Sequence, residues 1–194
     1  MEKFNNLAVL ILAAGTSSRL GEPKQLLKIG NDSLIKNAVK KALKISSKVC
    51  VVLGHKSDEI IDEIKNLPIS IIVNPNYTEG MASSISYGIN NLLKSDKVLI
   101  MLCDQPFIPL SHYIKLVEKS IANENTIICS KYQNRFAVPS IFPKNYYKNL
   151  EELKGDKGAK KFLDENPLKF VSLDDEFSID IDTKDDKKLL ENYI

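Results

Sequence analysis

The sequence predicts an α/β protein, a three-layer sandwich in which helices cover both faces of a mostly parallel, Rossmann-like sheet. Apolar, β-rich runs alternate with amphipathic segments of helical period along the 194 residues. Strands that are apolar throughout are typical of parallel sheets buried on both faces. No repeat, low-complexity tract or linker interrupts this alternation. We therefore expect a single domain over residues 1–194.

The individual elements follow from these runs in chain order. The expected strands comprise residues 7–12, 49–53, 69–73, 98–102, 126–130 and 169–173, with an extended segment over 136–142. The expected helices comprise residues 33–45, where Ser33 can cap the first turn, 57–66, 80–94, 111–122, 146–153, 156–165 and a terminal helix from 184. Ligands bind such sheets beyond the carboxyl ends of the strands. The loops that follow Leu12, Leu53, Val73 and Leu102 should therefore converge on one edge of the sheet.

The composition is that of an ordinary globular protein, with 43% hydrophobic and 27% charged residues and a formal net charge of +2. Basic residues form no stripe interleaved with aromatics, which argues against a nucleic-acid partner. The first apolar run is too short to span a membrane and lacks a signal-peptide cleavage pattern. We therefore expect a cytoplasmic protein without a membrane partner. Cys50, Cys103 and Cys129 lie in or beside apolar runs, so buried, reduced thiols are expected.

The loop after the first strand is small, glycine-bearing and rich in hydroxyl groups. Small residues let backbone N–H groups approach an anion closely, and Arg19 and Lys24 can grip the outer oxygens of a polyphosphate. The loop is not a P-loop, because Glu22 and Pro23 separate Gly21 from Lys24, and it is not a dinucleotide fingerprint. The alternative is a plain surface connection. The candidate nucleotide-binding residues here are Leu12, Ala13, Ala14, Gly15, Thr16, Ser17, Ser18, Arg19 and Lys24.

Three aspartates are candidate metal ligands. Asp104 directly follows a buried strand, and Mg²⁺ prefers oxygen ligands, usually with only one or two protein carboxylates. Asp180 and Asp182 are two residues apart on an expected extended segment, so both side chains point to one face and one or both could complete the site. The alternatives are a turn or capping role for Asp104 and a helix cap at Asp182.

The start of the helix expected over 80–94 offers further ligand contacts. Gly80 permits close backbone approach, and Ser83 and Ser84 offer hydroxyl groups that could hold a base or ribose. The alternative is that these are ordinary first-turn residues. Gly54 could approach the base through its backbone, and His55 beside it could do the same or be a solvated loop residue.

Two remaining features are weaker. His112 follows Ser111 in an expected helix and is predicted to lie at the surface. Residues 155–160 form either a capped helix start that presents N–H groups to an anion or a plain capped loop. Neither histidine has a sequence partner that would suggest a nucleophilic triad.

Several short segments can be compared together with known families. They are Leu12-Ala13-Ala14-Gly15, Ser18-Arg19-Leu20-Gly21, Pro23-Lys24-Gln25-Leu26-Leu27, Asn74-Pro75, Gly80-Met81, Ser83-Ser84, Gly88, Cys103-Asp104-Gln105-Pro106, Gly155-Asp156, Gly158-Ala159 and Asp180-Ile181-Asp182-Thr183 with Asp186. In this order they resemble the nucleotidyltransferase superfamily of the molybdenum cofactor guanylyl- and cytidylyltransferases, and its cytidylyltransferase branch in particular. The resemblance covers nearly the whole chain.

The resemblance implies a sheet of the nucleotide-diphospho-sugar transferase type, with a nucleotide-binding half over residues 1–110 and an acceptor-binding half over 111–194. It implies Mg²⁺-dependent transfer of CMP from CTP, or of the corresponding nucleotide from GTP, to molybdopterin with release of pyrophosphate. Arg19, Lys24 and Asp104 would be the catalytic residues, and Asp104 with Asp180 would hold the metal. Ala13, Gly54, Gly80 and Ser84 would line the base and ribose.

The acceptor side departs from the family pattern. Ala137 and Val138 stand ahead of Pro139, where the family usually has a small-polar pair, often Gly-His. Lys160 replaces a position that is commonly arginine. Two alternatives therefore stay open: a nucleotidyltransferase for another acceptor, such as a sugar or alcohol phosphate, and a non-catalytic maturation factor of a molybdenum hydroxylase. Such a hydroxylase is an expected partner.

Overall fold

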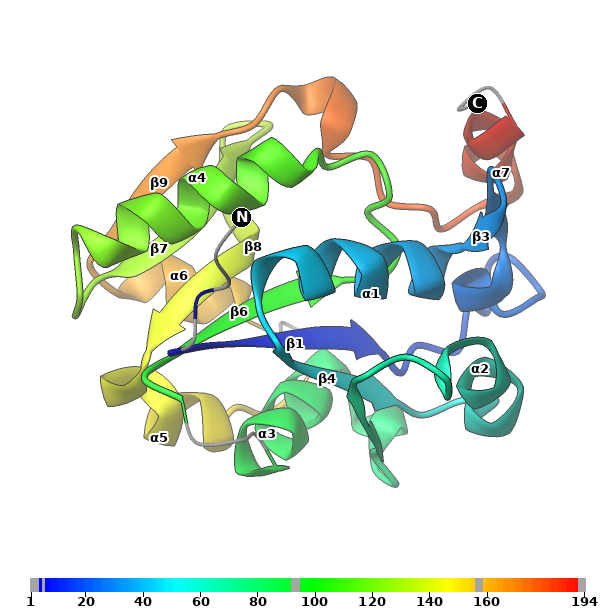
Figure 1. Cartoon of the computed structure of the whole chain (residues 1–194), viewed down its shortest axis with the longest axis horizontal. Helices are drawn as coiled ribbons and strands as arrows, with labels where there is room; N and C mark the ends of the chain where they lie inside the picture. The colour runs from blue at the N-terminus through cyan, green and yellow to red at the C-terminus, as the bar shows by residue number, and fades with distance from the viewer. Residues whose placement is uncertain (1–3, 5, 92–94, 156–158, 192–194) are drawn as a thin grey trace.

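A seven-stranded sheet forms the centre of the computed structural model, which describes residues 4, 6–91, 95–155 and 159–191 (Figure 1). Its strands are β1 Leu7–Ala13, β4 Lys48–Leu53, β5 Ser70–Val73, β6 Lys97–Leu102, β7 Ile127–Tyr132, β8 Arg135–Pro143 and β9 Leu168–Ser172. They lie in the order β5–β4–β1–β6–β8–β7–β9. A short hairpin, β2 Lys28–Ile29 and β3 Asp32–Ser33, stands apart. The predicted α/β class with a mostly parallel sheet is confirmed.

One strand of the sheet runs against the others. β1 is parallel to β4 and β6, and β7 is parallel to β9, whereas β8 is antiparallel to both β6 and β7. Gln133 and Asn134 join β7 to β8 with positive φ angles of 47° and 56°. A two-residue turn with both φ angles positive matches the twist of an antiparallel hairpin. As a result, β7 ends at the same sheet edge as β1 and β6.

Helices cover both faces of the sheet (Figure 1). One face carries α1 Leu34–Ile45, α2 Ser57–Ile64 and α4 Leu110–Ile121, and the other carries α3 Met81–Asn91, α5 Tyr147–Glu151 and α6 Lys160–Glu165. The side chains of β1 alternate between the two layers, with Val9 and Ile11 on the first face and Leu10 and Leu12 on the second. Ser33 caps α1 as predicted, because its side chain accepts a hydrogen bond from the Lys36 N–H.

A third apolar cluster holds together four segments that are distant in the sequence. It contains side chains from the loop after β1, from the β2–β3 hairpin, from the loop after β6 and from the segment around the last helix, α7 Lys184–Glu191. Burial of these side chains away from water holds the loops against one another. The members of this cluster are Leu20, Leu27, Ile29, Leu34, Phe107, Ile181 and Leu190.

Some expected elements differ in extent. The helix expected over 57–66 ends at Ile64, and that expected over 146–153 is only Tyr147–Glu151 after a 3-10 turn. Residues 92–94 and 156–158, part of two expected helices, lie outside the described residues. The hairpin and the 3-10 turns at Lys24–Leu26, Tyr77–Glu79 and Asp175–Phe177 were not predicted, because elements this short carry no periodic signal. No helix in the described ranges is long and apolar enough to cross a bilayer.

Candidate active site

The loops that follow β1, β5 and β6 meet around a cavity of about 320 Å³ at the carboxyl edge of the sheet. The predicted residues that line it are Leu12, Ala13, Ala14, Gly15, Thr16, Lys24, Gly80, Ser84 and Asp104. The rest of its wall is formed by Gln25, Tyr77, Thr78, Met81, Leu102 and Cys103. The predicted convergence of these loops is therefore confirmed, since it follows from the parallel direction of the strands.

The loop after β1 is held in shape by a buried glutamine. The Gln25 side chain, 1% exposed, donates hydrogen bonds from Nε2 to the carbonyl oxygens of Ala13 at 2.8 Å and Gly15 at 3.1 Å. Ser17 adopts a positive φ of 54°, and its Oγ accepts the Lys24 N–H at 3.1 Å. Residues 12–16 of the strand end and loop line the cavity.

A chain of ion pairs crosses the site. The Lys24 ammonium contacts Asp104 Oδ2 and lies 2.8 Å from Asp182 Oδ1, and Arg19 Nη2 lies 2.8 Å from Asp182 Oδ2. Burial by itself would lower the pKa of Lys24, but the Asp104 and Asp182 carboxylates outweigh burial and raise that pKa above its ordinary value. The same cations outweigh burial at Asp182 and lower its pKa. Lys24 is therefore charged, and Lys24 and Arg19 each already have a carboxylate partner.

Asp180 joins this group from the C-terminal segment. The Ile181 N–H donates to the Asp104 carbonyl at 2.9 Å, which ties the segment to the end of β6. Asp180 Oδ1 accepts a hydrogen bond from Gln105 Nε2 at 2.8 Å. Burial, followed by the negative charge of Asp104, raises the pKa of Asp180. Asp180 is therefore close enough to Asp104 for the two carboxylates to repel each other, as two ligands of one shared cation would.

The predicted Mg²⁺ fits this donor set. Asp104 Oδ1 is buried and has no hydrogen-bond partner among the described residues, and an orphaned carboxylate oxygen is a suitable ligand for a hard cation. The structure does not bring three such side chains around one point, since the described residues include no group of three or more His, Cys, Asp or Glu placed to hold a metal. Asp182 is engaged by Lys24 and Arg19 instead.

Other predicted residues lie beside the cavity. Ser83 Oγ donates to the carbonyls of Asn76 and Gly80, and it accepts Asn74 Nδ2 at 3.0 Å. A Cβ added at Gly54 would lie 2.5 Å from the Tyr77 Cβ, so Gly54 permits the close packing of the wall. Ser17, Ser18 and Arg19 form the outer rim of the loop and do not line the cavity itself.

The histidines have different surroundings. The prediction that His112 lies at the surface is wrong: it is 4% exposed, because it lies on the inward face of α4, and its Nε2 lies 2.8 Å from Ser130 Oγ. Burial, with a smaller contribution from Lys115, lowers the pKa of His112 to about 4. His55 is half-buried, and its backbone N–H donates to the Ala14 carbonyl at 3.4 Å. The three cysteines are buried free thiols, as predicted.

Three polar residues of the site were missed by sequence reasoning. Gln25, Gln105 and Asn74 are buried and organise the loops through hydrogen bonds. The sequence holds a signal for each of them. Gln25 and Gln105 directly follow the predicted site residues Lys24 and Asp104, and Asn74 begins a turn. Of the anion loop predicted over 155–160, residues 156–158 lie outside the described part of the chain.

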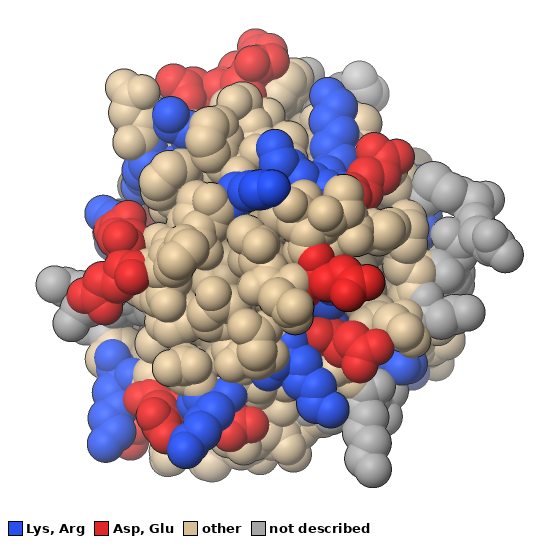
Figure 2. Space-filling view, turned by 90° about the vertical axis from the view of Figure 1, so that its left-hand side faces the viewer, with Lys and Arg blue, Asp and Glu red and all other residues tan. Residues whose placement is uncertain are grey.

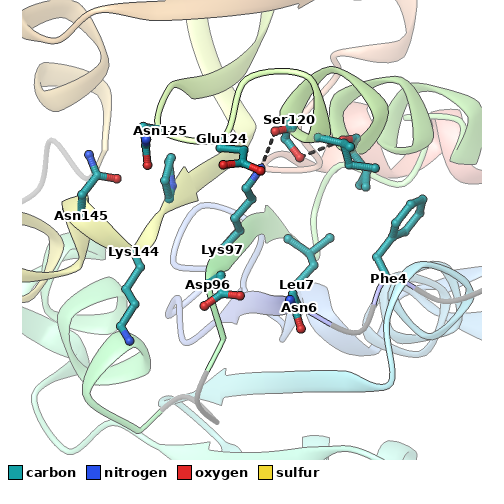
Figure 3. Close-up of a pocket in the computed structure, with 13 residues that line it drawn as sticks. Phe4, Asn6, Leu7, Asp96, Lys97, Ser120, Glu124, Asn125, Lys144 and Asn145 are labelled. Carbon is teal, nitrogen blue, oxygen red and sulfur yellow. Dashed lines mark hydrogen bonds between the residues drawn. The ribbon is translucent and has the colours of Figure 1, made fainter.

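A larger pocket, of about 640 Å³, lies at the opposite edge of the sheet, around the amino end of β6 (Figure 3). Its wall includes Asp96, Lys97, Glu124 and Lys144. The Lys97 ammonium donates to the Ser120 carbonyl, and burial lowers its pKa. The charges seen on this end of the molecule are of mixed sign around an uncharged centre (Figure 2). None of the residues predicted to act in the chemistry lies in this pocket.

Two cations on a glycine-bearing loop meet carboxylates at the carboxyl end of a central strand, an arrangement that suits the transfer of a nucleotidyl group from a triphosphate. The sequence agrees with this chemistry: residues 9–170 match the family described as the MobA-like NTP transferase domain. The chain belongs to that family.

Two curated relatives illustrate its range. The chain is 27% identical over 120 residues to a molybdenum cofactor cytidylyltransferase of Escherichia coli, a match that covers 61% of each chain. It is 29% identical over 171 residues to the purine catabolism protein PucB of Bacillus subtilis, with 82% of this chain and 81% of PucB covered. The match to the cytidylyltransferase thus spans less than two thirds of that protein.

The fold has counterparts among solved structures. Rv0371c of Mycobacterium tuberculosis superposes with a TM-score of 0.85 over 98% of both chains, at 23% sequence identity. At this level of identity the likeness concerns the fold, and it confirms the predicted sheet architecture.

Proposed function

We propose that this protein is a Mg²⁺-dependent cytidylyltransferase that transfers CMP from CTP to the phosphate of molybdopterin and releases pyrophosphate. The observation that carries the proposal is the meeting of Lys24 with Asp104 at the carboxyl end of β6, inside the cavity walled by residues 13–16. Its volume of about 320 Å³ suits a small-molecule ligand. The choice of CTP and of molybdopterin is supported by the sequence resemblance to the cytidylyltransferase branch.

The reaction requires positioning and charge neutralisation more than covalent work by the protein. An oxygen of the acceptor phosphate forms a bond to the α-phosphorus, and the bond from that phosphorus to the bridging oxygen breaks. Pyrophosphate leaves with the electron pair of the broken bond. No oxidant or reductant is needed, and the attacking oxygen is already ionised.

Each residue of the site has a defined task in this scheme. The backbone N–H groups of Gly15 and Thr16, which line the cavity, would cradle the triphosphate, with Ser17 and Ser18 as further candidates, and Arg19 and Lys24 would exchange their carboxylate partners for phosphate oxygens. Asp104 and Asp180 would hold Mg²⁺, with Asp182 as a further candidate. When bound, this ion polarises the α-phosphate and stabilises the leaving group.

A second acceptor, a sugar or alcohol phosphate, is favoured by one observation. Val138 places an apolar side chain against the core, and its carbonyl accepts the Tyr132 hydroxyl at 3.0 Å. This segment therefore offers an acceptor no polar side chain where relatives of the resembled family have one. A non-catalytic maturation factor of a molybdenum hydroxylase is the third candidate, with that hydroxylase as its partner.

Pyrophosphate release separates these candidates. Purified protein is incubated with Mg²⁺ and either CTP or GTP, together with molybdopterin, a sugar phosphate or no acceptor. The proposal expects release with CTP and molybdopterin, and loss of that release when EDTA is added. Release with a sugar phosphate and none with molybdopterin would overturn it. Nucleotide binding by calorimetry without release for any acceptor would instead favour the maturation factor.

A further inference from the structure

Arginine is rare in this protein, and both arginines lie at the carboxyl edge of the sheet, near the candidate active site. Of the 27 Lys and Arg residues, only Arg19 and Arg135 are arginine. Arg19 pairs with Asp182 across the loop after β1. Arginine differs from lysine in its planar fork of five N–H donors, which suits bidentate contact with phosphate or carboxylate. A lysine at position 135 would lack this planar fork, so the presence of an arginine there points to a role that needs it.

Arg135 begins β8, directly after the turn from β7, at the carboxyl edge of the sheet. It pairs across the hairpin with Tyr132, and its guanidinium carbon lies 5.2 Å from the centre of the Tyr132 ring. The ring is fixed in turn, because the Tyr132 hydroxyl donates to the Val138 carbonyl and lies 3.3 Å from Gln105 Nε2. The Arg135 guanidinium thus packs against a tyrosine ring whose position is fixed by its own hydrogen bonds.

Gln105 connects Tyr132 to the carboxylates of the site. Its Nε2 also donates to Asp180 Oδ1 at 2.8 Å, and it is the neighbour of Asp104 in the chain. The positive charge of Arg135 acts on Asp180 and opposes the rise in the pKa of that carboxyl group. Arg135 therefore lies on the acceptor-half side of the carboxylates, whereas Lys24 contacts Asp104 and Asp182 from the nucleotide half.

The three cations of the site differ in what they already bind. Lys24 and Arg19 are paired with carboxylates. Arg135 is exposed, and within the described part of the chain no hydrogen bond or ion pair engages its guanidinium besides the contact with the Tyr132 ring. An arginine stacked on a ring keeps its edge donors directed outward. Its N–H groups are therefore available to an anion from the acceptor.

We propose that Arg135, laid on Tyr132 beside Asp180, binds the phosphate of the acceptor and restricts the enzyme to phosphorylated acceptors. This inference rests on the proposed nucleotidyl transfer, but it concerns the acceptor phosphate whichever molecule carries it. Arg135 holds the attacking phosphate on the side of the α-phosphorus away from Arg19 and Lys24, which hold the leaving pyrophosphate. Such placement serves an in-line displacement.

The first test uses the small number of arginines. Protein labelled with ¹⁵N gives two arginine Nε–H resonances, and the Arg135→Lys variant assigns them. Titration with inorganic phosphate, at constant ionic strength, should shift the Arg135 resonance in a saturable way. A resonance that stays unchanged, or that shifts equally with chloride, would overturn the proposal. This measurement needs no turnover, so it holds even if molybdopterin is not the acceptor.

The second test is kinetic. With the acceptor that supports pyrophosphate release, Arg135→Ala should raise the acceptor KM about tenfold or more, the loss of one charge-assisted contact, and leave the KM for CTP unchanged. Arg135→Lys should recover part of the loss. The matched control is Lys131→Ala on the same hairpin, where the lysine lies 4.8 Å over the Phe170 ring; it should leave both constants unchanged. An unaltered acceptor KM in Arg135→Ala, or equal changes in both constants, would contradict the assignment.

Discussion

The two ends of β6 show why the smaller cavity is the better candidate site. Asp96 precedes the strand at the pocket of about 640 Å³, and Asp104 follows it at the cavity of about 320 Å³. At the amino end Asp96 is exposed, and the Lys97 ammonium is satisfied by the Ser120 carbonyl. A buried oxygen lacks a partner among the described residues at both ends, but it is the neutral hydroxyl of Ser95 at the amino end and a carboxylate oxygen of Asp104 at the carboxyl end. A buried carboxylate oxygen costs more free energy to leave unpaired than a hydroxyl does, so the carboxyl end calls for a ligand more strongly.

The direction of the strands produces this difference. In a parallel sheet the loops that leave the carboxyl ends carry residues from several distant segments to one edge. Here Arg19, Lys24, Asp104, Asp180 and Asp182 all reach that edge, as the ion pairs and the Ile181–Asp104 hydrogen bond show. At the amino ends of the strands lie the ends of helices such as α4, whose last residue, Ile121, is 56% exposed.

The largest expected effect tests this comparison on one strand. Asp104→Asn should lower kcat/KM about a thousandfold, because a metal ligand contributes several kcal/mol of transition-state stabilisation. Asp96→Asn, at the other end of β6, should leave kcat/KM unchanged. Pyrophosphate release measures activity, and urea unfolding checks that both variants are folded. Equal activities of the two variants would remove the distinction between the ends.

A smaller effect is expected from the cations. Lys24→Met should raise the KM for CTP roughly thirtyfold, since one charge-assisted contact with the triphosphate is lost. Lys144→Met, at the amino-end pocket, should not change that KM. Initial rates over a range of CTP concentrations provide the measurement. If Lys144→Met weakens CTP binding as much as Lys24→Met does, the nucleotide does not bind at the carboxyl end.

The smallest effect concerns the inward face of α4 and separates stability from activity. The pKa of His112 is about 4 in the folded protein, below the ordinary value of about 6.5, so the unfolded chain takes up a proton first as the pH falls. His112 should therefore lower the free energy of unfolding by about 2 kcal/mol between pH 7 and pH 5. His112→Asn should flatten this dependence in urea titrations. An unchanged slope in that variant would show that His112 does not titrate in this way.

Local patterns in the sequence were sufficient to predict most of the fold. Apolar runs such as Leu7–Ala13 and the helix capped by Ser33 appear where they were expected. The direction of β8 depends on the positive φ angles of Gln133 and Asn134, a conformation that neither residue type requires. His112 was misplaced because one polar residue on a helix does not reveal which face turns inward.

The candidate site was predicted in its parts but not in its connections. The loop, Asp104 and the Asp180–Asp182 pair were identified because each combines small or charged residues with the end of an apolar run. The hydrogen bond from Gln105 to Asp180 spans 75 residues, and no local pattern announces it. The metal assignment stays a prediction, because Lys24 occupies the space between Asp104 and Asp182 in this structure.

The ion pair between Arg19 and Asp182 joins residues that are 163 positions apart. During synthesis the loop after β1 leaves the ribosome long before Asp182, the shared partner of Arg19 and Lys24. Before residues 181 and 182 have been made, Ile181 is missing from the third apolar cluster, and neither Arg19 nor Lys24 can pair with Asp182. Contacts of such long range form late in folding. The candidate site is therefore completed only after Asp182 has been made, although the sheet that carries it can begin to form long before.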